Sequence, residues 1–291
     1  MTKIGIVGTG MLGEAVGLHL LDVGYEIIVF NRSNEKTENL KKNGETVVES
    51  PKEVAKNTDL VIIVVKDADA VNDVIFGDYG ILAGNHEGMC IADMSTVNPN
   101  STKEISEKVI ATGTDYLEIP VMGGPNVAID GKLVLMASGE KEIFEKFKQV
   151  FDSIAEQSFY LGNTGTAHSI KLAMNLQISM LALSLSEGIT LTKKAGFDTE
   201  IFLKILNSTY FKTGMSEGKA YKMIKESYEP TFTLANLKKD LDTINDAAES
   251  CNAELPMAKL ARKIYSDAKE AGFGDIDYTG IIAYIKKLSE K

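Results

Sequence analysis

The sequence has few cysteines and few histidines. Its 291 residues include two cysteines, Cys90 and Cys251, and three histidines, His19, His86 and His168, with neither a CxxC motif nor metal-ligand spacing. Disulfide frameworks and zinc sites need such side chains in clusters. The sequence therefore predicts neither of them and no metal site, and two isolated cysteines favour a reducing, cytoplasmic location.

Long apolar runs are also scarce. No basic and apolar leader precedes the first motif, KIGIVG, so we expect no signal peptide. The most apolar stretch, residues 172–186, is shorter than the roughly 20 residues that span a bilayer. It also contains Asn175 and Gln177. This stretch predicts a buried helix and no membrane partner.

Basic residues are in the minority. Lysine and arginine total 31, aspartate and glutamate total 41, and the net charge is −10 at pH 7. Nucleic acid requires a basic surface, so this balance argues against a nucleic-acid partner. A small anionic ligand needs only a local cluster of donors and is compatible with the charge.

The pattern along the chain changes near residue 162. Before that point, short β-rich runs alternate with helical patterns: KIGIVG, EIIVF, LVIIVV, CIADMS, DYLEIPV and LVLMAS. This alternation predicts a Rossmann-type, doubly wound α/β domain with parallel strands, over residues 1–162. After residue 162 the pattern predicts an all-helical domain, residues 163–291, that begins with a long interdomain helix. Its expected helices are roughly 165–195, 198–208, 213–225, 233–251, 256–271 and 276–289.

A glycine-rich turn follows the first β-rich run and opens a helical pattern. Gly8, Gly10 and Gly13 form the G-x-G-x-x-G pattern of dinucleotide-binding proteins. The glycines allow a tight turn, a close approach of backbone to pyrophosphate, and close helix–strand packing. A plain tight turn is the alternative. We predict a cofactor site formed by Gly8, Thr9, Gly10, Met11, Leu12 and Gly13.

The second β-rich run ends in the sequence VFNRS, residues 29–33. In NAD-binding proteins an acidic residue at this place binds the 2′-hydroxyl of the adenosine ribose. The same carboxylate would repel the 2′-phosphate of NADP. Arg32 can pair with that phosphate through charge-assisted bonds, Asn31 can contact the ribose and Ser33 adds a donor. An ordinary surface arginine is the alternative. The stretch favours NADP, with NAD possible.

Several further motifs occur in order along almost the whole chain. They are FGDYGIL at 76–82, DMSTVNP at 93–99, EIPVMGG at 118–124, GNTGTAHSIKLAMN at 162–175 and FTLANLKKDL at 232–241. With GIVGTGMLG, they make the sequence similar to the β-hydroxyacid dehydrogenase family. That family includes 3-hydroxyisobutyrate dehydrogenases and the glyoxylate and succinic semialdehyde reductases. The FGDYGIL and NR features most resemble the reductase branch.

The resemblance places the family's catalytic lysine at Lys171. A protonated lysine can donate to a carbonyl oxygen while hydride reaches the carbon, and it can act as a base in the reverse direction. Asn175 lies four residues later, on the same face of the expected helix, and would hold that oxygen or the lysine. The alternative is a lysine that only extends from an apolar helix to solvent.

The resemblance also implies contacts outside this helix. Thr96 would contact the nicotinamide portion of the cofactor, and Ser95 the substrate, although this segment could instead only begin a helix. Lys239 would lean onto the cofactor or substrate, Phe232 would close the pocket, and Lys238 is expected in solvent.

One position departs from the family. Met122 stands where the family usually has serine, while Gly123 and Gly124 are retained, so their N–H groups could still bind a substrate carboxylate. The methionine thioether is a weak hydrogen-bond acceptor and cannot replace the serine hydroxyl. The identity of the substrate therefore does not follow from the resemblance. His168 could tune Lys171 or pack on a helix face.

Together these features predict an NADP-dependent oxidoreductase. It would reduce a small semialdehyde or 2-oxo acid, such as glyoxylate, succinic semialdehyde or a 3-hydroxyisobutyrate-type substrate, to the hydroxy acid. The apolar helical half predicts a homodimer or homotetramer. The alternatives are an imine reductase-like relative and a non-catalytic NADP-sensing or interaction protein.

Overall fold

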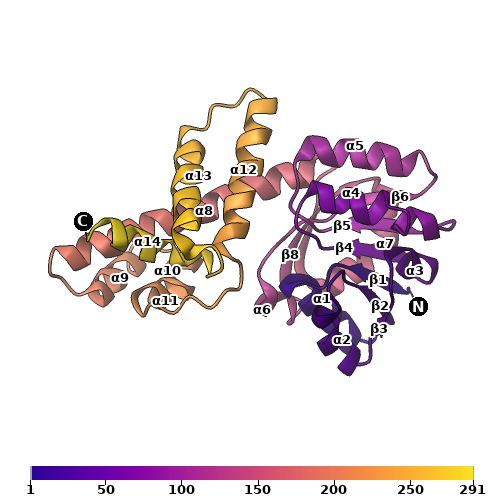
Figure 1. The fold of residues 1–291 in the computed structure, drawn as a ribbon, viewed down its shortest axis with the longest axis horizontal. Helices are drawn as coiled ribbons and strands as arrows, with labels where there is room; N and C mark the ends of the chain where they lie inside the picture. The colour runs from indigo at the N-terminus through magenta and orange to yellow at the C-terminus, as the bar shows by residue number, and fades with distance from the viewer. Residues whose placement is uncertain (1, 291) are drawn as a thin grey trace. The chain divides into compact units, whose positions relative to one another are not determined.

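The computed structural model describes residues 2–290 and divides into two compact units, Met1–Lys171 and Leu172–Lys291. The first unit is a sheet with helices on its faces, and the described part of the second contains helices and short turns but no strand longer than a single bridge (Figure 1). The predicted fold class, a Rossmann-type domain followed by an all-α domain, is confirmed.

The sheet has the strand order β3-β2-β1-β4-β5-β6-β8-β7, with β9 beside β8. The strands are β1 (Ile4–Val7), β2 (Ile27–Phe30), β3 (Thr46–Val47), β4 (Leu60–Ile63), β5 (Cys90–Asp93), β6 (Asp115–Glu118), β7 (Val121–Met122), β8 (Leu133–Gly139) and β9 (Ala155–Tyr160). From β3 to β6 all neighbours are parallel, as predicted.

The sheet departs from the prediction at its β8 edge. Strand β8 is antiparallel to β6 and β7 and parallel to β9. A parallel connection is usually made through a crossover helix that packs along the sheet. Between β6 and β8 the chain forms only β7 and the short helix α6 (Pro125–Ala128), so β8 returns in the opposite direction.

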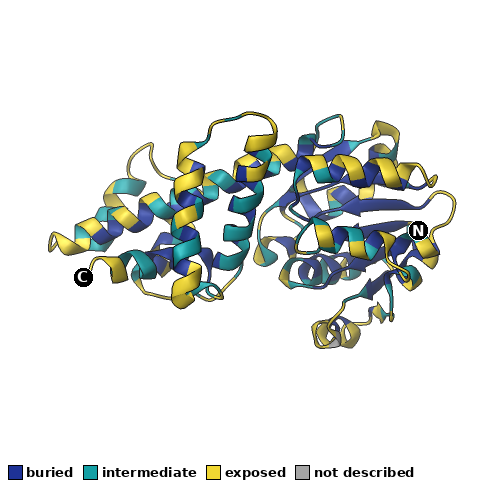
Figure 2. Ribbon diagram, turned by 45° about the horizontal axis from the view of Figure 1, so that its top comes forward, coloured by how far each residue is buried: buried dark blue, intermediate teal, exposed yellow. Residues whose placement is uncertain are grey.

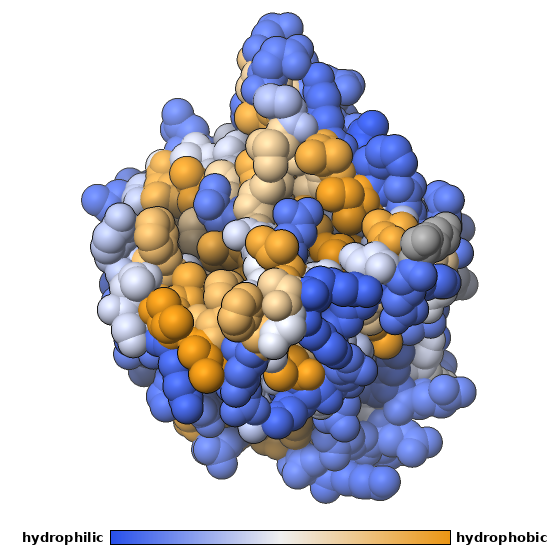
Figure 3. All heavy atoms as spheres, turned by 90° about the vertical axis from the view of Figure 1, so that its left-hand side faces the viewer, coloured by the Kyte–Doolittle hydropathy of each residue, from blue (hydrophilic) through white to orange (hydrophobic). Residues whose placement is uncertain are grey.

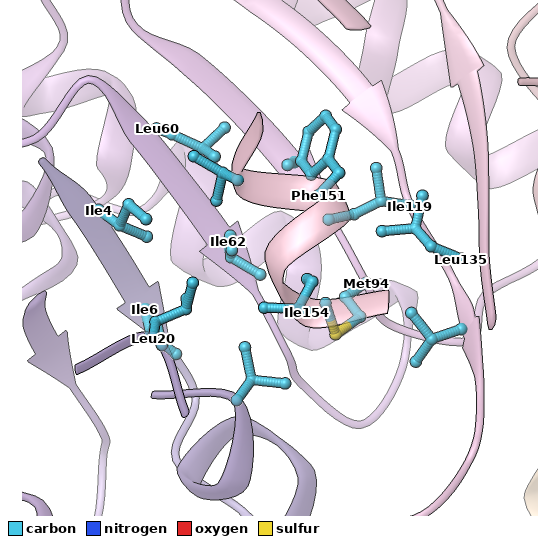
Figure 4. Packing of buried hydrophobic residues seen from close by; sticks show 14 of the residues in the cluster. Ile4, Ile6, Leu20, Leu60, Ile62, Met94, Ile119, Leu135, Phe151 and Ile154 are labelled. Atoms are coloured by element: carbon cyan, nitrogen blue, oxygen red, sulfur yellow. The ribbon is translucent and has the colours of Figure 1, made fainter. Parts of the chain in front are cut away.

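Helices cover both faces of this sheet. They are α1 (Met11–Asp22), α2 (Glu38–Lys42), α3 (Pro51–Lys56), α4 (Ala68–Phe76), α5 (Pro99–Ile110), α6 and α7 (Lys141–Ile154), with short 3₁₀ turns at Asn34–Thr37 and Ile81–Gly84. Alternate strand residues enter two clusters: Ile4 and Ile6 pack with α1 and α7, whereas Val7 packs with α3, α4 and α5. Figure 4 shows the first cluster, and Figure 2 shows the buried strands in dark blue.

Helix α8 (Thr166–Lys194) begins in the first unit and continues into the second. The predicted boundary at 162/163 lies just before it, whereas the first turn of α8 is hydrogen-bonded to the sheet of the first unit. By length and composition α8 could also cross a membrane. Its residues Leu172, Ala182, Leu185 and Ile189 pack into two hydrophobic clusters, which favours a core helix.

The remaining helices of the second unit follow the predicted ranges closely. They are α9 (Thr199–Asn207), α10 (Gly214–Gly218), α11 (Ala220–Ile224), α12 (Leu234–Ser250), α13 (Pro256–Ala268) and α14 (Ile281–Leu288). The range 213–225 forms two short helices instead of one, and α13 ends in a π-helical turn, Lys269–Phe273, where Gly272 has a φ of 95°.

Candidate functional site

The glycine turn between β1 and α1 has the shape that a dinucleotide pyrophosphate needs. A Cβ on Gly8 would lie 2.2 Å from the Val64 carbonyl oxygen, and one on Gly13 would lie 2.0 Å from the Gly8 carbonyl oxygen. Both positions therefore require glycine. A Cβ on Gly10 would meet nothing within 4 Å, and Gly10 begins α1 without a side-chain cap. No side chain at the N-cap thus takes up the first N–H groups of α1, as an anion site at a helix N-terminus requires.

The end of β2 is tied to this turn. Asn31 Oδ1 accepts from the Thr9 N–H at 3.0 Å, and Asn31 Nδ2 donates to the Ser33 carbonyl at 3.0 Å. The Asn31 amide therefore positions the two segments against each other. Arg32 and Ser33 are exposed beside them.

A second basic residue, Lys36, lies after the end of β2, and it was not among the residues predicted from the sequence. It lies in the 3₁₀ turn after Ser33, and the Lys36 carbonyl accepts from the Thr9 hydroxyl at 3.0 Å. The NRSNEK spacing, with a basic residue four positions after Arg32, was the signal that could have identified it.

Ser95 and Thr96 follow β5 at the carboxyl edge of the sheet. Ser95 is buried, its hydroxyl accepts from the Val65 N–H at 3.0 Å, and its own N–H donates to Asp93 at 2.9 Å. The visible role of Ser95 is therefore to join the ends of β4 and β5. Thr96, predicted to contact the nicotinamide, is partly exposed beside it.

Lys171 and Met122 come together within the first unit. Lys171 lies in the second turn of α8, is partly buried, and its Nζ is 3.4 Å from Met122 Sδ. Met122 ends β7, and Gly123, with a φ of 121°, and Gly124 lead into α6. A Cβ on Gly123 would lie 2.8 Å from Leu133 Cδ2, so this turn is built for glycine.

A buried polar cluster surrounds Asn175 in the second unit. Asn175 Nδ2 donates to Asp240 Oδ2 at 2.7 Å, and the Lys239 ammonium forms an ion pair with Asp240 Oδ1 at 2.7 Å. Asn175 Oδ1 has no hydrogen-bond partner among the described residues. Asp240 thereby fixes which way the amide points. Its role was missed, although it directly follows the predicted Lys239.

Phe232 is held just before α12 by a second buried carboxylate. Asp277 accepts from the N–H and hydroxyl of Thr231 and from the Lys219 ammonium, which is 3.0 Å away. Burial alone would raise the pKa of Asp277, but the Lys219 charge and these hydrogen bonds lower it. The Phe232 ring packs edge-on against Tyr278 at 5.9 Å between centroids.

Metal ligands are not clustered in the part of the chain that the structure describes: it contains no group of three or more histidine, cysteine, aspartate or glutamate side chains suited to an ion.

Two family models cover most of the chain. The NAD-binding domain of 6-phosphogluconate dehydrogenase matches residues 3–162. The NAD-binding domain of NADP-dependent 3-hydroxyisobutyrate dehydrogenase matches residues 165–285. The boundary between the two matches lies directly before α8.

Individual proteins resemble the chain over its whole length. Glyoxylate/succinic semialdehyde reductase 1 of Arabidopsis thaliana is 33% identical, over 98% of both chains. The crystal structure of 3-hydroxyisobutyrate dehydrogenase from Salmonella typhimurium superposes with a TM-score of 0.89 at 25% identity, over 98% of this chain and 100% of that one. Cytokine-like nuclear factor N-PAC of Xenopus tropicalis is 31% identical over 97% of this chain, which spans 53% of that protein.

Proposed function

The chain belongs to the β-hydroxyacid dehydrogenase family, and we propose that it reduces a small semialdehyde or 2-oxo acid to the hydroxy acid with Lys171 as the proton donor. The family, the class of NAD(P)-dependent dehydrogenase and the cofactor, NADP with NAD possible, are as the sequence predicted. The substrate and the role of Lys171 form the proposal.

The cofactor fits the residues at the carboxyl edge of the sheet. The glycine turn and the N-terminus of α1 would hold the pyrophosphate, and Arg32 and Ser33 would bind the 2′-phosphate. By the resemblance, Thr96 would contact the nicotinamide end, and Lys239 would be a further contact to the cofactor. When bound, the nicotinamide supplies the hydride.

Lys171 handles the proton. In the reduction its ammonium donates a proton to the carbonyl oxygen as negative charge develops there, and in the oxidation the neutral amine takes the hydroxyl proton. The N–H groups of Gly123 and Gly124 bind the substrate carboxylate. By the resemblance, Asn175, oriented by Asp240, would hold the reacting oxygen or the lysine, and Phe232 would close the pocket.

The observation that carries this proposal is the position of Lys171. It lies on α8, partly buried, with its ammonium against the residue that opens the Gly123–Gly124 turn. The test is a panel of small aldehydes and oxo acids, from glyoxylate to succinic semialdehyde, assayed with NADPH and with NADH. Turnover of a carboxylate-bearing carbonyl with loss of NADPH absorbance supports the proposal, whereas activity only on uncharged carbonyls or imines contradicts it.

Two observations favour other candidates. Met122 lies beside Lys171 and makes the surroundings of the lysine less polar than a serine would. A less polar substrate site favours an imine reductase-like relative. The similarity to N-PAC, which is named as a cytokine-like nuclear factor, favours a non-catalytic NADP-binding protein. The substrate panel separates the first from our proposal, and loss of turnover on removal of Lys171 separates the second.

Self-association is also part of the proposal. On α9, Leu203 is buried inside the second unit, whereas Ile201 and Ile205 on the outer face are 54% and 62% exposed. Phe197 just before this helix and Leu191 near the end of α8 are each 72% exposed. Figure 3 shows apolar side chains gathered on one face of the molecule. Such an apolar surface favours a homodimer or homotetramer.

We also propose a cytoplasmic location, because the two cysteines, Cys90 and Cys251, are free thiols.

A further inference from the structure

The N-terminus of α8 is capped by side chains from distant strands. Glu118 at the end of β6 accepts from the N–H groups of Gly165 and His168, the latter at 2.9 Å. Ser138 on β8 accepts from the Ala167 N–H at 2.8 Å and donates to Glu118 at 2.8 Å. The first N–H groups of a helix lack partners within it, and a carboxylate there also complements the helix dipole. Glu118 therefore anchors the helix that carries Lys171.

The fourth partner of this carboxylate is the imidazole of His168. His168 is fully buried, and its Nδ1 lies 2.8 Å from Glu118 Oε2 and 2.8 Å from the Thr102 hydroxyl. Its Nε2 lies 2.9 Å from the Ser95 carbonyl oxygen. With Ser138, Gly165 and the His168 N–H, the ring completes four donors to Glu118, about as many as a carboxylate accepts.

Both ring nitrogens must carry a proton in this arrangement. The Ser95 carbonyl can only accept, so Nε2 donates to it. An ionised Glu118 can only accept, so we assign the Nδ1 proton to the bond with Glu118, and the Thr102 hydroxyl then donates to the Asn98 carbonyl at 3.2 Å. This assignment makes His168 a buried imidazolium.

The charges around the ring agree with this assignment. Burial alone would lower the pKa of His168, but the hydrogen bond and charge of Glu118, followed by Asp93 on β5 and the Ser95 carbonyl, raise it. Burial would likewise raise the pKa of Glu118, but the hydrogen bond and charge of His168 and the Ser138 hydroxyl lower it. Tyr116 donates to Asp93 at 3.2 Å on the same side.

The ring thus joins three segments that carry predicted site residues. His168 lies three residues before Lys171, and residues three apart are neighbours on a helix surface. Its Nε2 holds the carbonyl of Ser95, directly before Thr96. Its Nδ1 holds Glu118, from which the chain runs to Met122.

We propose that His168, as an imidazolium paired with Glu118, is a positioning residue that holds Lys171, Thr96 and the Met122 turn in their working arrangement. This inference rests on the proposed function, because it assumes that Lys171 transfers the proton. His168 itself contacts neither substrate nor cofactor.

The test compares four variants with the parent: His168→Gln, Ser138→Ala, His19→Gln and Lys171→Met. His19 is the matched control, because its ring also bridges two carbonyl oxygens, those of Ile129 and Ser153, at 3.0 and 2.8 Å. For each variant kcat, KM, the NADPH dissociation constant and the thermal midpoint are measured. The ¹⁵N spectrum of the three histidine rings in the parent reports protonation directly.

His168→Gln should lower kcat about 10- to 100-fold, because a misplacement of about 1 Å can cost that much, while NADPH binding changes less than about threefold. Ser138→Ala, a milder change at the same anchor, should lower kcat less. His19→Gln should lower the thermal midpoint and keep kcat. In the parent, both nitrogens of the ring whose signals are absent from the His168→Gln spectrum should stay protonated above pH 7.

The outcomes separate the two claims. If Lys171→Met keeps its turnover, the proposed function falls and the positioning role falls with it. If Lys171→Met is inactive but His168→Gln and Ser138→Ala both keep kcat within about twofold, only the positioning role is wrong. A parent spectrum in which the ring lost in His168→Gln has an unprotonated nitrogen at pH 7 also overturns the role of His168.

Discussion

The ammonium of Lys171 lies 3.4 Å from the sulfur of Met122, so the proposed proton donor faces a thioether where the family usually has a serine hydroxyl. A thioether is a weak acceptor, whereas a hydroxyl both donates and accepts. The pair therefore links the identity of the substrate to one side chain, and it leads to the first prediction.

Replacing Met122 with serine should tighten the binding of carboxylate substrates. A hydrogen bond to a charged group is worth about 1.5–3 kcal/mol, so KM for glyoxylate or succinic semialdehyde should fall about tenfold or more. Loss of the partly buried methionine should lower stability by roughly 2 kcal/mol. Steady-state kinetics and thermal unfolding measure both effects.

Met122→Leu is the matched control, because it keeps an apolar side chain of similar volume. It should leave KM for the carboxylates unchanged. If Met122→Ser loses activity on every carboxylate and the parent prefers an uncharged carbonyl or imine, the carboxylate part of the proposal is wrong. The NADP and Lys171 parts would survive that result.

Arg32 should determine the choice of cofactor. In the parent, kcat/KM should favour NADPH over NADH, and Arg32→Asp should reduce this preference by about 10- to 150-fold, since a charge-assisted contact is worth about 1.5–3 kcal/mol. Arg262→Asp makes the same change on α13 and should leave the preference intact. Equal use of both cofactors by the parent would contradict the role of Arg32.

The outer face of α9 should mediate assembly. Ile201→Glu with Ile205→Glu should convert the oligomer to a smaller species in sedimentation, because each places a charge in an apolar interface. Lys41→Glu, on the exposed surface of α2 in the first unit, makes the same change of charge and should not change the sedimentation. A parent that sediments as a monomer would contradict the expected assembly.

Glu45 should make stability depend on pH. Its carboxylate is 4% exposed, without a hydrogen-bond partner among residues 2–290, and burial, followed by the charge of Glu14, raises its pKa from 4.5 to about 7. Between these two pH values the folded chain holds a proton that the unfolded chain has released, so stability falls as pH rises. The loss should reach at most about 3 kcal/mol.

Thermal unfolding between pH 4.5 and 8 measures this contribution. Glu45→Gln should flatten the dependence, with its gain in thermal midpoint over the parent larger at pH 8 than at pH 5. Glu38→Gln, on the exposed surface of α2, should leave the slope as it is. A parent slope that Glu45→Gln does not change would show that Glu45 is ionised in the folded chain.

The sequence predicted local structure well where periodicity and glycine positions determine it. Such patterns predicted most strands from β1 to β6, the start of α8 and the glycine turn. They also placed Lys171 and Asn175 one turn apart. The antiparallel β8 was not predicted, because strand direction depends on how the chain returns after β6 and not on the strand's own residues.

Tertiary partners account for most of what the sequence did not reveal. Asp240 orients Asn175, and Glu118 caps α8, across separations of 65 and 50 residues that no local pattern encodes. Ser95, which follows β5, was predicted to contact the substrate, and the sequence did not reveal that its hydroxyl accepts from the Val65 N–H. Such roles depend on which backbone groups lie nearby after folding.

The most direct test of the account is the turnover of Lys171→Met with NADPH and the best substrate of the parent. General acid–base assistance contributes about 10²–10⁴-fold, so kcat should fall at least that much while the NADPH dissociation constant changes less than about threefold. Lys194→Met, the same change in the last turn of α8, should keep the parent's kcat. If Lys171→Met retained more than about a tenth of the parent's kcat, Lys171 would not be the proton donor and the proposed mechanism would be wrong.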